Sequence, residues 1–288
     1  MSVLVGRSVA LVLFATIAAA CAGGASPLPT QGVASPPASV NGPSGSGPSL
    51  EPAPLTVLGA ASLKGALDKV KTAWEAAHPG STLTISTDSS AALETQIEQG
   101  APADVFLSAD TSNPKKLVDR SLADGTAVNF AGNVLTIVVP TANPGGITSP
   151  DDLAKKGVKI IAAGDDVPIT KYANQAVANL ARQPDAPAGF AASYAANVVS
   201  KEDNVKAVIA KIELGEGDAG IVYVTDAKAS TKVSVVAIPD AANVPATYAG
   251  VVVKASAHVA TAHAFLDWLA GSDGQAILKS FGFLPPAD

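Results

Sequence analysis

Short apolar runs and amphipathic helical stretches alternate along the chain from residue 55, and this alternation most constrains the fold. The first runs have the apolar, β-branched character of buried strands, whereas the stretches between them carry apolar residues at helical spacing. A strand–helix–strand–helix–strand order predicts a parallel sheet with helices on its faces. These five elements are expected as strand 55–58, helix 62–77, strand 83–87, helix 90–99 (closed by Gly100) and strand 105–108.

The same alternation continues to the C-terminal end. With 288 residues, 48% of them hydrophobic, the chain is long enough for two modest domains with cores of their own. The pattern fits an α/β fold with two lobes of about 100 residues each, joined by strands that cross more than once, and a ligand cleft between the lobes. Later strands are expected at 134–139, 158–162, 221–224, 233–238 and 251–254, and later helices at 170–182, 204–213, 257–269 and 274–281.

The N-terminal segment has the features of an export signal. Arg7 supplies a positive charge, and residues 11–20 form an apolar stretch that is too short to span a bilayer. Cys21 follows directly and is the only cysteine of the chain, so it cannot form an internal disulfide. The arrangement resembles a bacterial lipobox, which predicts a signal peptide at 1–20 and lipidation of Cys21. Cleavage nearby to give a soluble secreted protein is the alternative.

Residues 21–54 are rich in Gly, Pro, Ser and Ala after the cysteine. Such a segment cannot bury enough apolar surface to offset its chain entropy. It is therefore predicted to be a flexible tether that holds the folded part above a membrane.

Composition and motifs argue against several classes of function. The net charge is −6 and no cluster of Lys and Arg is present, which disfavours binding to nucleic acid. A GxGxxG match at 215–220 follows a helix and precedes a strand, the reverse of the order that dinucleotide binding needs. The histidines His78, His258 and His263 show no metal-ligand spacing, and no GxSxG nucleophile motif occurs. No metal site, cofactor or catalytic residue is expected, and an enzyme is the less favoured hypothesis.

Four expected helix starts carry groups that suit a small anion. Ser62 opens the first helix, Thr87-Asp88-Ser89-Ser90 the second, residues 167–170 the third and residues 203–205 the fourth. Taken singly, these residues are ordinary helix caps. In a parallel α/β sheet, however, helix N-termini gather at the carboxyl edge, where backbone N–H groups and hydroxyls can bind an oxyanion without Lys or Arg.

Four segments carry a family resemblance. These are AASL at 60–63, SSAALETQIEQGAPADVFLSAD at 89–110, GDDVPITKYA at 164–173 and EDNVKAVIAKIELGEGDAGIVYVTDA at 202–227. In this order and spacing they resemble the periplasmic molybdate-binding proteins of ABC importers, over residues 55–285. The resemblance implies a two-lobe periplasmic-binding-protein fold of type II, with lobe I formed by 55–135 plus 228–288 and lobe II by 136–227.

The resemblance also implies a set of ligand-binding groups. The oxyanion would be held by the hydroxyls of Ser62 and Ser90, the backbone amides of Ile169 and Val205, and the hydroxyl of Tyr223. Judged from the residues alone, Tyr223 is better explained as a core tyrosine with an internally satisfied hydroxyl than as a binding residue.

The function implied is capture of molybdate, and of the nearly equal-sized tungstate, by a monomer that delivers it to a membrane permease driven by a cytoplasmic ATPase. The alternatives are a receptor for sulfate or phosphate, an enzyme on the same two-lobe fold, and a lipid-anchored surface protein that binds another protein.

Overall fold

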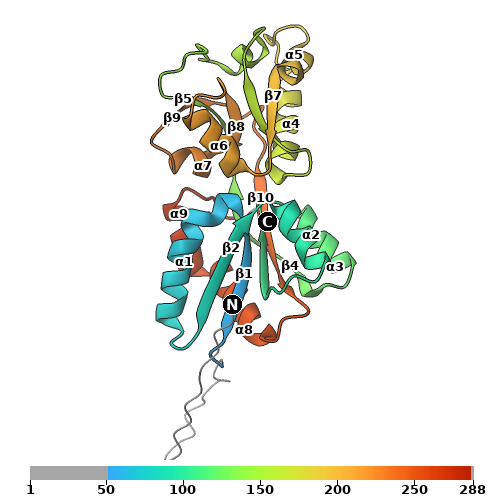
Figure 1. Ribbon diagram of the computed structural model, residues 1–288, viewed down its shortest axis with the longest axis vertical. Coiled ribbons are helices and arrows are strands. Elements are labelled where there is room, and N and C mark those ends of the chain that lie inside the picture. The colour runs from blue at the N-terminus through green and yellow to red at the C-terminus, as the bar shows by residue number, and fades with distance from the viewer. Residues whose placement is uncertain (1–50, 287–288) are drawn as a thin grey trace, which may run out of the picture. The chain divides into compact units, whose positions relative to one another are not determined.

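The computed structural model describes residues 51–286 (Figure 1). The predicted signal peptide, Cys21 and nearly all of the predicted tether lie outside the described residues. At the tether's C-terminal end, Ala53 is buried and its N–H donates to Ser81 Oγ, 3.3 Å away. Pro54 already belongs to the first strand. The folded part therefore begins slightly before the predicted boundary at residue 55.

A five-stranded sheet with the order β2-β1-β3-β10-β4 forms the first half of the folded part. Strand β1 runs parallel to β2 and β3, as the strand–helix alternation predicts. The sheet as a whole is mixed, which corrects the expectation of a parallel sheet, because β10 returns from late in the chain and pairs antiparallel with β3 and β4. The bounds are β1 Pro54–Ala60, β2 Thr82–Asp88, β3 Val105–Ser108, β4 Ala123–Asn133 and β10 Ala246–Val253.

Helices cover both faces of this sheet because successive strand residues point to opposite sides (Figure 1). Val57 packs in one apolar core with residues of α1 and α8, whereas its neighbour Leu58 packs in a second core with residues of α2 and α3. Phe106 lies in the second core, and Val105 and Leu107 lie in the first. The helices are α1 Lys64–Ala77, α2 Ser90–Glu98, α3 Ser112–Asp119, α8 Val259–Ala270 and α9 Ser272–Ser280.

The second half is built on two smaller sheets. An antiparallel sheet has the order β8-β5-β9, and a parallel pair is formed by β6 and β7. A parallel bridge between Ile160 and Ala219 connects this pair to the segment that enters β8. The strands are β5 Leu135–Pro140, β6 Ile160–Ala163, β7 Val198–Glu202, β8 Gly220–Tyr223 and β9 Val233–Ala237; the helices are the 3-10 helix η2 Pro150–Ala154, α4 Pro168–Leu180, α5 Phe190–Asn197, α6 Val205–Glu213 and α7 Val224–Lys228.

The chain passes between the two halves at two places in the described residues. It leaves the five-stranded sheet between β4 and β5 and returns between β9 and β10. Strand β9 falls in the range 228–288 that the sequence assigns to lobe I, yet it pairs with β5 in the second half. In the described residues 51–286, none of the helices is both long and apolar enough to cross a membrane.

Candidate anion-binding site

The five residues predicted to bind an oxyanion all line one pocket. The pocket is narrow, with a cavity volume of about 10 Å³, and it is partly open to solvent. Its walls come from both halves of the folded part, namely from the ends of β1, β2 and β3 on one side and from the starts of α4 and α6 and the end of β8 on the other. The lining residues are Ala60, Ala61, Ser62, Asp88, Ser89, Ser90, Ala109, Val167, Pro168, Ile169, Asn204, Val205 and Tyr223.

Ser62 lies in a different local structure from the one predicted. It is the middle residue of a single 3-10 turn, η1 Ala61–Leu63, and α1 begins after that turn with Leu63 as its N-cap. Its hydroxyl therefore caps no helix. The Ser62 side chain is buried, and its Oγ lies 2.8 Å from the Tyr248 hydroxyl oxygen.

Ser90 is the first residue of α2 and is almost fully buried. Its Oγ accepts a hydrogen bond from the Ala109 backbone N–H at 3.0 Å. A serine hydroxyl carries one hydrogen and two lone pairs, so accepting this bond leaves its hydrogen available. Ser90 can therefore donate into the pocket.

The Ile169 and Val205 amides lie in the first turns of α4 and α6. Pro168 occupies the first helical position of α4, and Val205 is the first residue of α6 after its cap Asn204. Within residues 51–286 neither amide donates to a protein acceptor. N–H groups of a first helical turn have no intrahelical partner and carry the positive end of the helix dipole. Both amides are thus suited to an anion in the pocket that they line.

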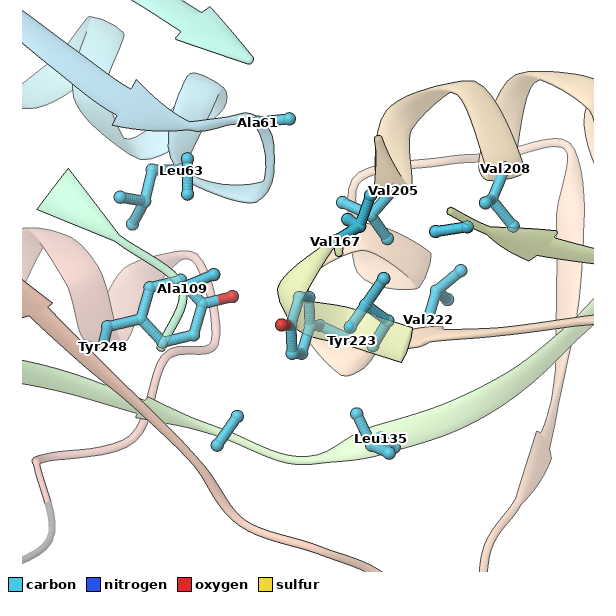
Figure 2. Packing of buried hydrophobic residues seen from close by; sticks show 14 of the residues in the cluster. Ala61, Leu63, Ala109, Leu135, Val167, Val205, Val208, Val222, Tyr223 and Tyr248 are labelled. Carbon is cyan, nitrogen blue, oxygen red and sulfur yellow. The ribbon is translucent and has the colours of Figure 1, made fainter. Parts of the chain in front are cut away.

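Tyr223 ends β8 and is 1% exposed. Its hydroxyl oxygen is buried and has no hydrogen-bond partner in the described part of the chain. Burial raises its pKa well above the ordinary value, and the neighbouring Tyr248 and Tyr172 add to this effect, so the hydroxyl keeps its proton. Figure 2 shows the Tyr223 and Tyr248 hydroxyls pointing toward one another. Buried polar atoms are rarely left unpaired, so this hydroxyl calls for a partner from outside the chain.

Among residues 51–286, Asp88 is the only charged side chain that lines the pocket. Its Oδ1 accepts hydrogen bonds from the Ser89 backbone N–H at 2.7 Å and from Asn204 Nδ2 at 3.0 Å. Asn204 Oδ1 meanwhile accepts from the Ala207 N–H at 3.1 Å and so caps α6. The side chain of Asn204 therefore joins the start of α6 to the loop that presents Ser90. Sequence reasoning treats Asp88 and Asn204 only as separate caps, because nothing in the sequence signals that the two residues meet.

A wider cleft that shares Asp88, Ser89 and Val167 with the pocket has a mainly acidic lining. Lys116 pairs with Glu94 at 3.4 Å, and Lys201 pairs with Asp165 at 2.5 Å. The charged residues of the cleft, which we call the acidic rim, are Asp88, Glu94, Asp165, Asp166, Glu202 and Asp203 together with Lys116 and Lys201. Any affinity of the pocket for an anion must therefore come from local donors and not from net charge.

Comparison with known proteins agrees with the motifs. The family model of bacterial extracellular solute-binding proteins matches residues 55–284. Mycobacterium tuberculosis ModA, a molybdate-binding protein, is 34% identical over 241 residues, which cover 83% of this chain and 88% of the relative. Bacillus subtilis YvgL, provisionally named as a substrate-binding lipoprotein of an ABC transporter, is 31% identical over 231 residues. The match covers 80% of this chain and 85% of YvgL.

A solved structure supports the same fold. The periplasmic molybdate-binding protein of Azotobacter vinelandii has a TM-score of 0.69 with this chain at 26% identity, and the match covers 81% of this chain and 100% of the other. The two-lobe binding-protein fold predicted from the sequence is thereby confirmed. The chain belongs to the family of bacterial extracellular solute-binding proteins.

Proposed function

We propose that this protein captures molybdate outside the cytoplasm and delivers it to the permease of an ABC importer. The observation that carries the proposal is the buried hydroxyl of Tyr223, which has no partner in the described part of the chain and lies in a pocket that no described Lys or Arg lines. Ser62, Ser90 and the amides of Ile169 and Val205 line the same pocket. We assign these five residues as the oxyanion-binding groups.

The donor set fits the physics of holding a dianion in a dry pocket. Removing a dianion from water costs much solvation free energy, which is recovered only if its oxygens receive hydrogen bonds from the protein. Bonds to a charged acceptor are shorter and stronger than bonds between neutral groups. Because the donors are neutral, no buried cation is needed beside the ion. The pocket therefore contains no cation that would be left unpaired when the ion leaves.

Molybdate is preferred as the ligand because similar proteins, Mycobacterium tuberculosis ModA and the Azotobacter vinelandii protein, are molybdate-binding proteins. Tungstate, which has almost the same size, should bind as well. In this proposal the oxyanion is a transported ligand and not a cofactor, and none of the five residues has a catalytic role. Sulfate is the second candidate because it is also a tetrahedral dianion. It ranks behind molybdate because it is smaller, so the same donors would fit it less tightly.

Calorimetric titration of the ligand-free full chain with molybdate, tungstate, sulfate and phosphate tests the proposal. One-to-one binding of molybdate and tungstate, with sulfate and phosphate much weaker, is the expected result. Equal or tighter binding of sulfate would transfer the proposal to sulfate. Absence of binding by all four ions would refute an oxyanion receptor.

Tyr223→Phe should have opposite effects on stability and on binding. The ligand-free variant loses an unsatisfied buried hydroxyl and is expected to be as stable as the wild type or more stable, by up to about 1 kcal/mol. Binding of molybdate should weaken about tenfold, because one donor to the ion is lost. Thermal unfolding without ligand and titration with molybdate measure the two effects. A core tyrosine without a role in binding would instead leave the affinity unchanged.

Residues 54–133 with 246–286 form one lobe in this proposal, and residues 135–245 form the other. Side-chain hydrogen bonds that join the lobes include those from Asn204 Nδ2 to Asp88 Oδ1, from Lys171 Nζ to Ser112 Oγ at 3.0 Å, and from Asn133 Nδ2 to Thr225 Oγ1 at 2.8 Å. Closure of the lobes brings the donors of both around one ion, and opening at the permease releases it.

Asn204→Asp is expected to weaken molybdate binding about tenfold by opposing this closure. Aspartate caps a helix as well as asparagine, so α6 keeps its cap, but a carboxylate now faces Asp88 at hydrogen-bond distance. The matched control is the exchange Asp88→Asn with Asn204→Asp, which keeps the net charge and allows the same hydrogen bond in reverse. Titration should show recovery of most of the affinity in the exchange variant. If the exchange variant binds no better than Asn204→Asp alone, neither repulsion of Asp88 nor the lost hydrogen bond is the cause, and this contact does not support closure.

Export and anchoring complete the proposal. Residues 1–20 are assigned as a signal peptide and Cys21 as a lipidated residue that anchors a monomer to the outer face of the cell membrane. The match to Bacillus subtilis YvgL, provisionally named as a lipoprotein, supports this assignment. Mass spectrometry of membrane fractions, compared with a Cys21→Ala chain, tests it: loss of both the lipid mass and the membrane association in the variant is the expected result.

A further inference from the structure

Tyr248 contacts a proposed ligand group but does not itself line the pocket. It lies in β10, is fully buried, and its hydroxyl oxygen is 2.8 Å from Ser62 Oγ. Either oxygen could be the donor on distance alone. The partners of Tyr248 decide between the two directions.

Asn133 is the second partner of the Tyr248 hydroxyl. Its Oδ1 accepts from the Val134 backbone N–H at 3.0 Å, which fixes the amide so that Nδ2 faces the other way. Nδ2 then donates to Thr225 Oγ1 at 2.8 Å and to the Tyr248 hydroxyl oxygen at 3.4 Å. Asn133 Nδ2 can only donate, so Ser62 Oγ is the one acceptor that the described residues place within reach of the Tyr248 hydrogen.

The direction of this bond sets the direction of the next one. Ser62 accepts from Tyr248, so the single hydrogen of its hydroxyl must point elsewhere, and Ser62 lines the pocket. Without Tyr248 the Ser62 hydroxyl could rotate freely and present a lone pair to an anion as readily as a hydrogen. A chain of hydrogen bonds running in one direction also polarises each member and strengthens the last donor.

We infer that Tyr248 is a positioning residue of the oxyanion site, and that the chain Asn133, Tyr248, Ser62 holds the Ser62 hydroxyl as a donor to the bound ion. The inference rests on the proposed function, because it takes the ligand to be an oxyanion in this pocket. All three side chains are at most 7% exposed. Water is therefore poorly placed to substitute for any link in the chain.

A double-mutant cycle on the full chain tests the inference, with molybdate titrated into wild type, Tyr248→Phe, Ser62→Ala and the double variant. Tyr248→Phe should weaken binding about tenfold when Ser62 is present, and should have almost no further effect in the Ser62→Ala background. A purely structural role of Tyr248 would instead weaken binding by the same factor in both backgrounds. That result, or unchanged affinity of Tyr248→Phe, would overturn the inference.

Tyr194→Phe is the matched control, because it removes the hydroxyl of a buried tyrosine in α5 that lies outside the pocket. It should leave molybdate binding unchanged.

If Tyr248→Phe unfolds at the temperature of titration, Asn133→Leu replaces it in the cycle and should show the same dependence on Ser62. Failure of the wild type to bind molybdate would count against the proposed function, whereas binding by the wild type without coupling between Tyr248 and Ser62 would count only against this inference.

Discussion

Val205→Pro is expected to weaken molybdate binding by about 10- to 100-fold while α6 stays folded. The loss corresponds to one backbone donor to a charged acceptor, which is worth about 1.5 to 3 kcal/mol. Proline has no N–H, so the substitution deletes the proposed donor and leaves no alternative hydrogen at that position.

At the position of Val205, proline should remove the N–H without disturbing the helix. It is the first residue of α6, where proline is well tolerated because the missing N–H has no helical acceptor. The preceding Asn204 has φ −157° and ψ 170°, an extended conformation that a residue before proline prefers.

Val205→Ala is the control for the lost side chain, since it removes similar apolar bulk and keeps the N–H. Titration with molybdate should separate the two variants by at least tenfold, and circular dichroism should show the same helix content in both. Equal affinities for the proline and alanine variants would remove the Val205 amide from the site.

Lys206→Met is expected to destabilise the protein by about 2 to 3 kcal/mol at neutral pH. Lys206 Nζ lies 3.0 Å from Asp226 Oδ1, and the Asp226 side chain has no exposed surface. Removing one member of a buried pair leaves an uncompensated buried charge, although the partly solvated lysine end moderates the loss.

The destabilisation should depend on pH in a defined direction. Burial raises the pKa of Asp226 above its ordinary value, and Lys206 opposes that rise, so the variant's Asp226 pKa should be higher still. A folded state that holds a proton more tightly than the unfolded state loses stability as pH rises toward the folded pKa. The difference in unfolding free energy between variant and wild type should therefore be largest above the folded-state pKa of Asp226 in the variant. It should shrink as the pH falls below that value.

Chemical denaturation across pH measures this gap. Lys115→Met is the control, because it breaks an exposed pair with Asp119 and should change stability by less than about 0.5 kcal/mol at any pH. Adding Asp226→Asn to Lys206→Met should restore most of the stability. A gap that is independent of pH would mean that lost packing, and not the Asp226 charge, causes the destabilisation.

The alternation of strands and helices could be predicted because each major element has a clear apolar period. The predicted strand 105–108 coincides with β3, and the predicted helix 204–213 coincides with α6 to within one residue. Sequence reasoning missed several short or half-exposed elements, among them β4, α3, α5 and β7. Strand β4 has a half-exposed N-terminal part and pairs with β10 through register shifts, and α3 is a short helix that contains Pro114.

The site was predictable where a motif marks a residue and unpredictable where only folding brings residues together. Ser62, Ser90 and Tyr223 stand in recognisable segments, and all three line the pocket. Tyr248 is 186 positions from Ser62, and Asn204 is 116 positions from Asp88. No local pattern records such a contact, because it depends on the return of β10 in one case and on the approach of the two halves in the other.

The acidic rim has a kinetic consequence for a receptor of dianions. A surface lined by carboxylates repels an approaching dianion over roughly one Debye length, about 8 Å at physiological ionic strength. Capture would then gain nothing from electrostatic steering and would speed up as salt screens the rim, the reverse of the usual behaviour for oppositely charged partners. In the proposed function, retention of the ion would therefore come from slow escape and not from fast arrival.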